Sequence, residues 1–149
     1  MSAFRLFGWE TTVTLRPMKK GKLEFSSHTA NLALMRRFVR KFLTNFPFTE
    51  KERALMVLGV DEACTNVIRY AYEMRDDQTI RLTIEVLRGC VRMRVRDYGA
   101  PIYKALNQLG SNRPKPGGRG IILMRQAFDK VDYLYKARGT ELVLTKNLE

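Results

Sequence analysis

Apolar residues recur at helical spacing in two stretches of the first half of the chain. The first stretch begins at about Thr29 and is ended by Pro47, and its inward positions are Met35, Phe38, Val39, Phe42 and Phe46. In the second, Thr49 and Glu52 have the spacing of a capping box, which predicts the start of a helix that runs to about Glu73. At about 100° per residue, the core stripe of this second helix is Val57, Val60, Cys64, Val67, Ile68 and Ala71.

Alternation with a period of two marks the strands. Apolar residues at 80, 82, 84 and 86, the turn Arg88-Gly89, and apolar residues at 91, 93 and 95 predict an antiparallel hairpin with one buried face. A short strand is expected at residues 22–25, and further strands near 131–135 and 140–145. Between them, residues 120–128 are predicted to form a helix with Ile121, Met124 and Phe128 inward.

Glycine and proline concentrate in one segment, since five of the ten glycines and three of the five prolines lie between Gly99 and Gly120. Such a long loop inside a compact domain is typical of a lid or a binding loop. The elements together predict an α+β fold, a two-layer sandwich whose mostly antiparallel sheet is covered on one face by helices. We expect one domain at residues 21–149 and an N-terminal extension at residues 1–20, which is either a strand near residues 11–15 or flexible.

The charge indicates an acidic partner. The 149 residues include 27 basic and 15 acidic ones, a net charge of +12, spread along the chain rather than gathered in a tail. No zinc-finger spacing and no RNP-like aromatic motif occurs, which disfavours direct binding of nucleic acid. Two cysteines cannot form a disulfide scaffold, and no apolar run approaches a membrane span or a signal peptide. We therefore expect a cytoplasmic protein that does not enter a membrane.

Asp97 breaks the pattern of its strand. It shares parity with Val91, Met93 and Val95, so that a carboxylate is expected at the end of a buried apolar stripe. An ionised group there needs hydrogen-bond donors. Gly99, two residues later, allows the backbone to approach a ligand closely. The alternative explanation is an aspartate that only caps a turn.

Glu62 and Asn66 stack one helical turn apart, nearly opposite the core stripe of their helix. An ordinary solvated face is the simplest explanation for Glu62. Asn66 is less easily explained, because asparagine is a mediocre helix former. At this spacing a glutamate and an amide oxygen can serve as a general base and a magnesium ligand.

The segment Pro116-Gly117-Gly118-Arg119-Gly120 opens the predicted helix at residues 120–128. A glycine-rich turn with backbone N–H groups at a helix N-terminus is suited to anions, although glycine turns before helices are common. The segment is not a P-loop, and the chain has no H-R-D or D-F-G motif of a eukaryotic-type protein kinase. Those two ATP-using architectures are therefore excluded.

Four segments in order resemble a known family: GVDEACTNVIRYAYE (59–73), RDYGAPI (96–102), PGGRGIILMRQAFDKVDY (116–133) and GTELVLTKNL (139–148). They are similar to the N-box, the two glycine boxes and the closing strand of the GHKL, or Bergerat, ATP-binding fold. Within that fold, the motifs are similar to the form found in the bacterial anti-sigma factor serine kinases of the RsbW and SpoIIAB type. The resemblance extends over residues 22–148.

The chain departs from the wider superfamily at three places. Asp97-Tyr98-Gly99-Ala100-Pro101 stands where D-x-G-x-G is usual, although proline is common there in the anti-sigma branch. Tyr70 stands where that branch usually has histidine. The single histidine, His28, precedes the first helix outside any phosphoacceptor motif, which disfavours a histidine kinase.

The resemblance implies a role for each matching residue. Asp97, with Gly99 beside it, would accept the adenine amino group, and Thr140 would complete the contact with the base. Asn66 would hold Mg²⁺ on the phosphates of ATP, and Glu62 would take the proton from a serine or threonine hydroxyl. The phosphates would lie in the turn formed by Gly117, Gly118, Arg119 and Gly120, under a lid at residues 103–116.

The resemblance also implies the partners: a sigma factor that the protein sequesters, a STAS-domain anti-sigma antagonist that it phosphorylates, and a second copy in a homodimer. Arg36, Arg37, Arg40 and Lys41 form a candidate contact surface for such a partner, with a plain solvated helix face as the alternative. Two other functions remain open. One is an ATP-binding adapter that sequesters a partner without phosphotransfer, and the other, disfavoured by the four motifs, is a nucleic-acid-binding module.

Overall fold

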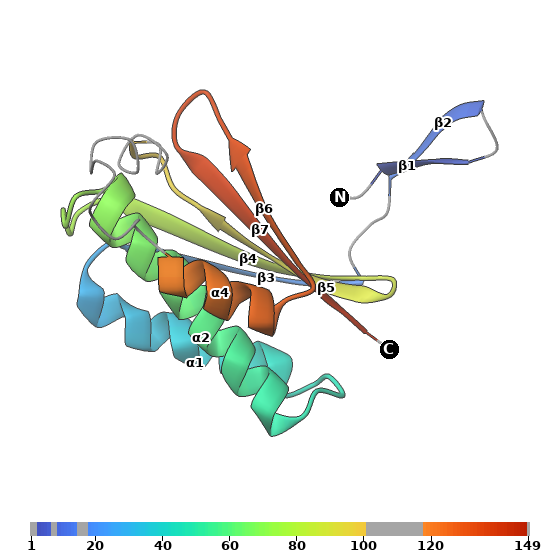
Figure 1. The fold of residues 1–149 in the computed structure, drawn as a ribbon, viewed down its shortest axis with the longest axis horizontal. Helices are drawn as coiled ribbons and strands as arrows, with labels where there is room; N and C mark the ends of the chain where they lie inside the picture. The colour runs from blue at the N-terminus through green and yellow to red at the C-terminus, as the bar shows by residue number, and fades with distance from the viewer. Residues whose placement is uncertain (1–2, 7–8, 15–17, 101–117, 149) are drawn as a thin grey trace.

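A five-stranded antiparallel sheet forms one layer of the molecule (Figure 1). The computed structural model describes residues 3–6, 9–14, 18–100 and 118–148. The strands lie in the order β3-β4-β5-β7-β6. Their bounds are β3 Lys19–Ser26, β4 Thr79–Leu87, β5 Cys90–Arg96, β6 Lys130–Tyr135 and β7 Thr140–Asn147.

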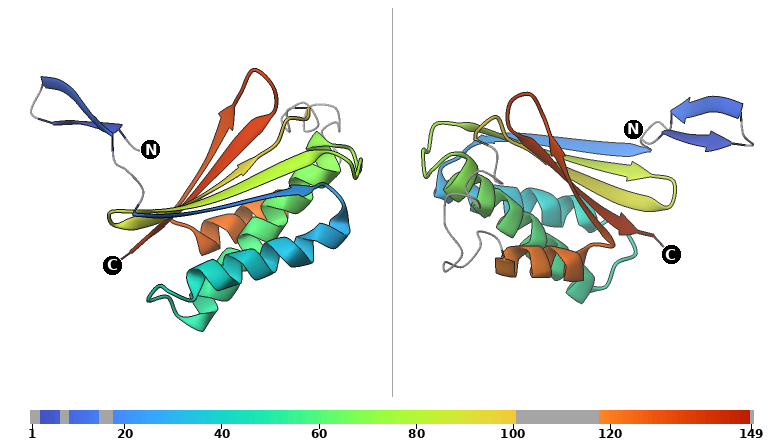
Figure 2. Two further views of the ribbon diagram at one scale, coloured as in Figure 1. Left: turned by 180° about the vertical axis from the view of Figure 1, so that it is seen from behind. Right: turned by 45° about the horizontal axis from the view of Figure 1, so that its top comes forward.

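Three helices form the second layer, on one face of this sheet (Figures 1 and 2). They are α1 (Leu32–Leu43), α2 (Glu50–Asn66) and α4 (Gly118–Ala127), and in both figures α2 lies between the other two. A 3₁₀ turn at Thr29–Asn31 precedes α1, and a π-helical turn at Val67–Ala71 continues α2. The α+β sandwich with helices on one face of an antiparallel sheet is thereby confirmed.

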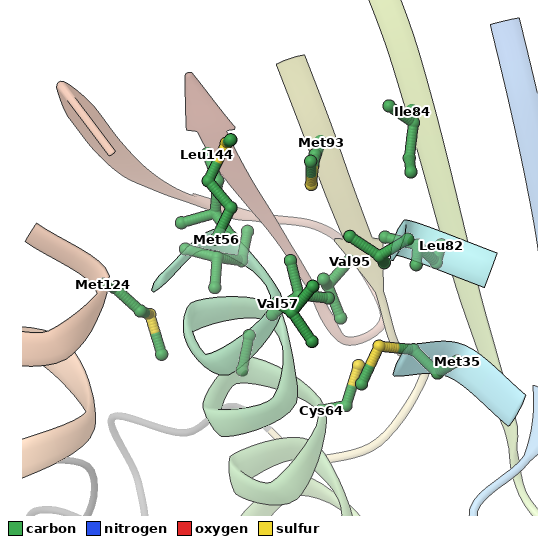
Figure 3. Close-up of a cluster of buried hydrophobic side chains, with 14 of the residues drawn as sticks. Met35, Met56, Val57, Cys64, Leu82, Ile84, Met93, Val95, Met124 and Leu144 are labelled. Atoms are coloured by element: carbon green, nitrogen blue, oxygen red, sulfur yellow. The ribbon is translucent and has the colours of Figure 1, made fainter. Parts of the chain in front are cut away.

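The core lies between the two layers (Figure 3). Every residue of the predicted stripe, which runs along α2 and the π-helical turn, is buried, with exposed fractions from 0% to 4%. These side chains meet the inward positions of the central strands, among them Leu82, Ile84, Met93 and Val95. Met124 on α4 closes the other side of the cluster and is fully buried. The period-two and helical patterns therefore place the core correctly.

The capping box at the start of the second helix is confirmed, whereas the predicted ends of the first helix are not. The capping box is formed: the Glu52 amide donates to Thr49 Oγ1 at 3.1 Å, and the Thr49 amide donates to Glu52 Oε2 at 2.8 Å. The first helix is shorter than predicted at both ends. It starts at Leu32, after the 3₁₀ turn, and ends at Leu43, four residues before Pro47.

Two further strands lie near the N-terminus. β1 (Ala3–Leu6) pairs with β2 (Trp9–Thr14) in a two-stranded sheet of its own. In Figures 1 and 2 this hairpin projects away from the sandwich. The strand expected near residues 11–15 thus exists as part of a hairpin, and it is not joined to the five-stranded sheet.

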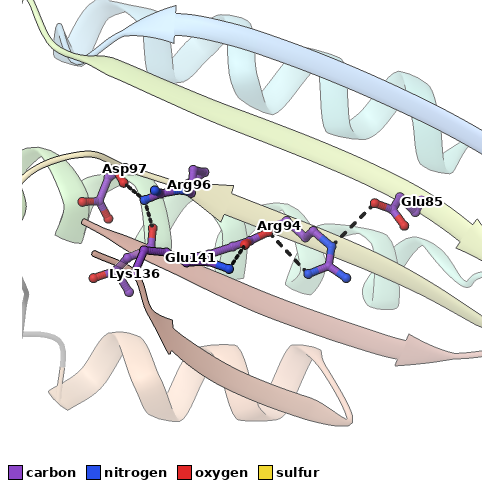
Figure 4. Close-up of polar contacts among 7 residues, drawn as sticks. Glu85, Arg94, Arg96, Asp97, Lys136 and Glu141 are labelled. Carbon is purple, nitrogen blue, oxygen red and sulfur yellow. Dashed lines mark hydrogen bonds and ion pairs between the residues drawn. The ribbon is translucent and has the colours of Figure 1, made fainter. Parts of the chain in front are cut away.

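The sheet face opposite the helices is covered by charged side chains (Figure 4). At its centre, Arg94 Nε lies 3.6 Å from Glu85 Oε1, and Arg94 Nη1 lies 3.4 Å from Glu141 Oε1. Lys136 Nζ lies 3.3 Å from Glu141 Oε2. These residues come from β4, β5, the β6–β7 turn and β7, so the network ties neighbouring strands together on the sheet face opposite the three described helices.

Candidate functional site

Asp97 directly follows β5 and is buried, with an exposed fraction of 1%. Its Oδ1 accepts a hydrogen bond from the Gly99 amide at 3.0 Å, and its own amide donates to the Thr140 carbonyl at 3.0 Å. Burial raises the pKa of this carboxyl, and the Gly99 hydrogen bond and the charge of Arg96 oppose that rise. The structure therefore places an acceptor at the end of an apolar stripe, as its strand parity predicts.

Thr140 begins β7 next to Asp97 and is also 1% exposed. Within the described part of the chain, its buried Oγ1 has no hydrogen-bond partner. A buried hydroxyl without a partner loses the free energy of a hydrogen bond, so it indicates a position that a ligand would satisfy. A carboxylate acceptor beside a free hydroxyl suits a purine base that carries both donors and acceptors.

Two glycines bring backbone segments into contact around Asp97. A β-carbon on Gly99 would lie 2.3 Å from the Ala71 carbonyl oxygen. A β-carbon on Gly139, whose φ is +77°, would lie 2.1 Å from the Asp97 carbonyl oxygen. Neither position can hold another residue without a shift of the backbone.

Glu62, Asn66 and Gly120 come together between α2 and α4. A β-carbon on Gly120 would lie 3.0 Å from Glu62 Oε2 and 3.4 Å from Asn66 Nδ2. Asn66 is only 6% exposed, and Glu62 is half-buried. The polar side of α2 is therefore not a solvated face: α4 packs on it, and the first turn of α4 faces the two side chains.

The π-helical turn joins these two groups of residues. It begins directly after Asn66 and ends at Ala71, whose carbonyl oxygen touches Gly99. Five residues advance about 7.5 Å along an α-helix, and a π-helical turn is not longer. Along the helix axis, Asn66 and Ala71, which touches the Asp97 region, are thus no more than about 7.5 Å apart, a separation suited to a base at one end and phosphates at the other.

Positive charge accompanies both ends of the site. Arg96 Nη1 donates to the Asp97 carbonyl, and its guanidinium carbon lies 4.3 Å from the centre of the Tyr98 ring (Figure 4 shows Arg96 beside Asp97). Arg119 is exposed in the first turn of α4, next to Gly118 and Gly120. Cations are unfavourable at a helix N-terminus unless an anion is close, so Arg119 fits a phosphate site better than an empty helix end.

Gly117 and the lid expected at residues 103–116 lie outside the described residues.

The residues present fit ATP and a shared magnesium ion. The orphaned Thr140 hydroxyl and the close approach at Gly99 suit an adenine ring, and the backbone amides of the first turn of α4 suit phosphates. Among the described residues, no group of three His, Cys, Asp or Glu side chains could hold a metal by itself. A magnesium ion at Asn66 would therefore need phosphate oxygens and water for most of its coordination.

Sequence patterns do not single out Gly139 or Ala71 as residues of this site. Gly139 is part of the fourth motif, and glycine is a recognisable turn signal, but its contact with Asp97 is not visible in the sequence. The approach of Ala71 to Gly99 depends on the π-helical turn, which no pattern in the sequence indicates.

In the parts of the chain that the structure describes, no helix is long and apolar enough to span a membrane.

Comparison with known proteins identifies relatives of this chain. The family model described as histidine kinase-like ATPase domain matches residues 25–146. The anti-sigma F factor of Clostridium beijerinckii is 30% identical over 133 residues, which cover 85% of this chain and 93% of that protein. The anti-sigma F factor of Clostridium botulinum (strain Eklund 17B / Type B) is 31% identical over 115 residues, 74% of this chain and 80% of that protein.

A solved structure shares the fold. The crystal structure of the RsbU and RsbW domains of a Mycobacterium tuberculosis protein superposes with a TM-score of 0.66 over 89% of this chain, at 17% identity. The chain spans 33% of that longer protein, and at this identity the likeness shows the fold alone. The present chain therefore belongs to the family of histidine kinase-like ATPase domains, in the group that includes the anti-sigma F factors, as its four motifs predict.

Proposed function

We propose that this protein is an ATP-dependent serine/threonine kinase that acts as an anti-sigma factor. The convergence of Glu62, Asn66 and Gly120 carries the proposal, because it brings a carboxylate, a side-chain amide and a helix N-terminus to one place. A carboxylate that only covered a helix surface would not face the first turn of α4. Phosphoryl transfer depends mainly on positioning and charge neutralisation, so these few groups suffice.

At the base end, Asp97 accepts a hydrogen bond from the amino group of adenine, and the Thr140 hydroxyl bonds the ring. Both side chains are buried, so these hydrogen bonds form away from water and discriminate between bases. Gly99 leaves room for the ring beside the backbone. Guanine has a carbonyl oxygen where adenine has the amino group, and an ionised Asp97 repels it.

At the phosphate end, amides of the first turn of α4 and the Arg119 side chain bind phosphate oxygens. Asn66 would hold a magnesium ion through its side-chain amide oxygen, and that ion would neutralise charge on the phosphates. Glu62 is close to this turn and half-exposed, so it can reach both the nucleotide and a protein substrate. It takes the proton of the substrate hydroxyl as the hydroxyl oxygen attacks the γ-phosphorus and ADP departs.

The partners follow from the relatives and from the charge. The relatives are named anti-sigma F factors, and we assign to this chain a sigma factor that it sequesters and a STAS-domain antagonist that it phosphorylates. We also assign it a homodimeric state. The basic surface of α1, formed by Arg36, Arg37, Arg40 and Lys41, is a contact region for one of these acidic partners.

Nucleotide titration is the first test. Calorimetry of the wild type with ATP, with and without Mg²⁺, is compared with Asp97→Asn and Asn66→Ala. Binding that requires Asp97 in both conditions, and requires Asn66 only with magnesium, supports the assignment of the site. No binding by the wild type would contradict it.

Phosphotransfer separates the kinase from the second candidate, an ATP-binding adapter. Each STAS-domain protein encoded in the source genome is incubated with radiolabelled ATP and with wild type or Glu62→Gln. The kinase proposal predicts label on one of them with the wild type and its loss with Glu62→Gln, since glutamine cannot accept the proton. If no STAS-domain protein is labelled while ATP binds normally, the adapter is the better description.

A further inference from the structure

Tyr72 lies directly after the π-helical turn and is one of the largest fully buried side chains of the molecule, with an exposed fraction of 1%. Its hydroxyl makes two hydrogen bonds to backbone in other elements. It donates to the Thr79 carbonyl at the start of β4 and accepts from the Tyr98 amide at 2.8 Å. One phenol therefore connects the end of the π-helical turn to the start of β4 and to the segment that follows β5.

The segment that Tyr72 holds is the one that carries Asp97. The Tyr98 amide bonds to Tyr72, the Gly99 amide bonds to Asp97 Oδ1, and the Ala100 amide donates to the Ala71 carbonyl at 3.0 Å. Three consecutive amides thus have fixed partners. Two of those partners, Ala71 and Tyr72, lie at the end of the π-helical turn, and the third is the carboxylate itself.

The chemistry of Tyr72 suits this double role. Burial raises the pKa of its hydroxyl, so the group stays protonated at neutral pH and can donate and accept at the same time. Phenylalanine would keep the ring in the core but leave the Tyr98 amide without its acceptor. The segment from Tyr98 to Ala100 would keep the Ala100 bond to Ala71, the Gly99 bond to Asp97 and the bond that the exposed Arg138 donates to the Tyr98 carbonyl. It would lose its one buried side-chain partner, and with it the Asp97 carboxylate would lose one support of its orientation.

We propose that Tyr72 is a positioning residue for the base-binding end of the site, whose phenol fixes the segment 98–100 and through it the Asp97 carboxylate. This inference rests on the proposed nucleotide site. It adds a residue that lies outside the ligand-contacting set and acts through Asp97. The role predicts an effect on base discrimination, because the orientation of one carboxylate distinguishes the amino group of adenine from the carbonyl of guanine.

The test compares Tyr72→Phe with Tyr133→Phe, which removes the hydroxyl of a partly buried tyrosine on β6. Affinities for ADP and GDP are measured by calorimetry, and thermal unfolding is followed in parallel. Tyr72→Phe is expected to weaken ADP binding about tenfold and to leave GDP binding unchanged, so that the ratio of the two affinities falls. Tyr133→Phe keeps the wild-type ratio. A Tyr72→Phe protein that folds and keeps the wild-type ratio overturns the proposal.

Hydrogen exchange in the wild type gives a second test that does not depend on a variant. If Tyr72 fixes the segment, the Tyr98 amide is protected before nucleotide is added, and ADP adds little to its protection. An unprotected Tyr98 amide in the nucleotide-free protein overturns the role of Tyr72. Failure of the wild type to bind ADP at all contradicts the nucleotide site itself, so the two failures are distinguishable.

Discussion

Gly139 touches the backbone of Asp97 so closely that a β-carbon at residue 139 would lie 2.1 Å from the Asp97 carbonyl oxygen. The turn between β6 and β7 therefore sets how far the end of β5 can move. We expect Gly139→Ala to destabilise the fold by about 2 to 4 kcal/mol, because its positive φ and the contact both oppose a side chain. We also expect it to weaken ADP binding, since Asp97 must shift.

Gly89→Ala is the matched control. Gly89 also has a positive φ, +87°, but nothing lies within 4 Å of the β-carbon. Gly89→Ala should lower the free energy of unfolding by only about 1 kcal/mol, because of the positive φ, and should leave ADP affinity unchanged. Urea unfolding and calorimetry measure both quantities. Equal effects of the two substitutions would show that the contact with Asp97 is unimportant.

Gly120→Ala tests the phosphate end. Alanine is the better helix former by about 1 kcal/mol, so the substitution should not lower stability much. Its methyl group would lie 3.0 Å from Glu62 Oε2 and must displace that side chain. We expect phosphotransfer to fall at least tenfold, with a smaller loss of ATP affinity. Ile122→Ala, at an exposed position of α4, is the control and should retain full activity.

Thr140→Val replaces a buried hydroxyl by a methyl group of similar size. Because Oγ1 has no partner among the described residues, the nucleotide-free protein should be as stable as the wild type or slightly more stable. ADP affinity should fall about five- to tenfold through the lost hydrogen bond to the base. Thermal unfolding without ligand and calorimetry with ADP give the two values. A loss of stability without a loss of affinity would assign Thr140 a purely structural role.

The raised pKa of Asp97 gives a pH dependence of stability. Burial disfavours the ionised form in the fold, so the folded pKa lies above the ordinary value of 3.8. The folded state then binds more protons than the unfolded state between the two values, and stability decreases as pH rises through that window. Asp97→Asn, which is neutral throughout, should be more stable than the wild type at neutral pH while losing ADP affinity.

Urea unfolding of both proteins from about pH 4 to 8 measures this difference. The stability advantage of Asp97→Asn should shrink as the pH falls, because the wild-type carboxyl becomes protonated. A difference that is independent of pH would show that Asp97 is not destabilised by its burial.

Charge reversal on α1 tests the partner surface. Arg36 is unsuitable for it, because its Nη1 pairs with Asp61 Oδ1 at 3.1 Å and its loss would disturb the α1–α2 contact. Arg37→Glu and Lys41→Glu change exposed residues instead. Both should weaken the complex with one of the two proposed partners, the sigma factor or the STAS-domain antagonist, in a salt-dependent way and leave ADP binding intact. Unchanged affinity for both the sigma factor and the STAS-domain antagonist would remove this surface from consideration.

Capping and strand-parity patterns predict much of the fold, because each depends on interactions within one helical turn or one strand. Thr49 and Glu52 form their capping box within one turn, and Asp97 follows the parity of its strand. The environment of Asn66 was not predictable in the same way. Periodicity places it opposite the core stripe, but only the tertiary packing of α4 turns that side into an enclosed one.

The residues that hold Asp97 in place could not be predicted from the sequence for a related reason. Tyr72 and Gly139 act through hydrogen bonds and contacts with backbone far away in sequence. A tyrosine near a helix end and a glycine in a turn are common, and neither residue type identifies its distant partner. The order of four motifs made the site recognisable, whereas the way in which it is held together required the structure.

Helix α4 takes part in both the candidate site and the hydrophobic core. Gly120 lies at the site, and one and two turns further along, Met124 and Phe128, directly after the helix, are buried in the core. A ligand that binds the start of this helix therefore also resists the separation of the two layers. Thermal unfolding should report occupancy directly, with an upward shift of the melting temperature that grows with ligand concentration. The same linkage makes the protein suitable for thermal screening of nucleotides before any protein partner is known.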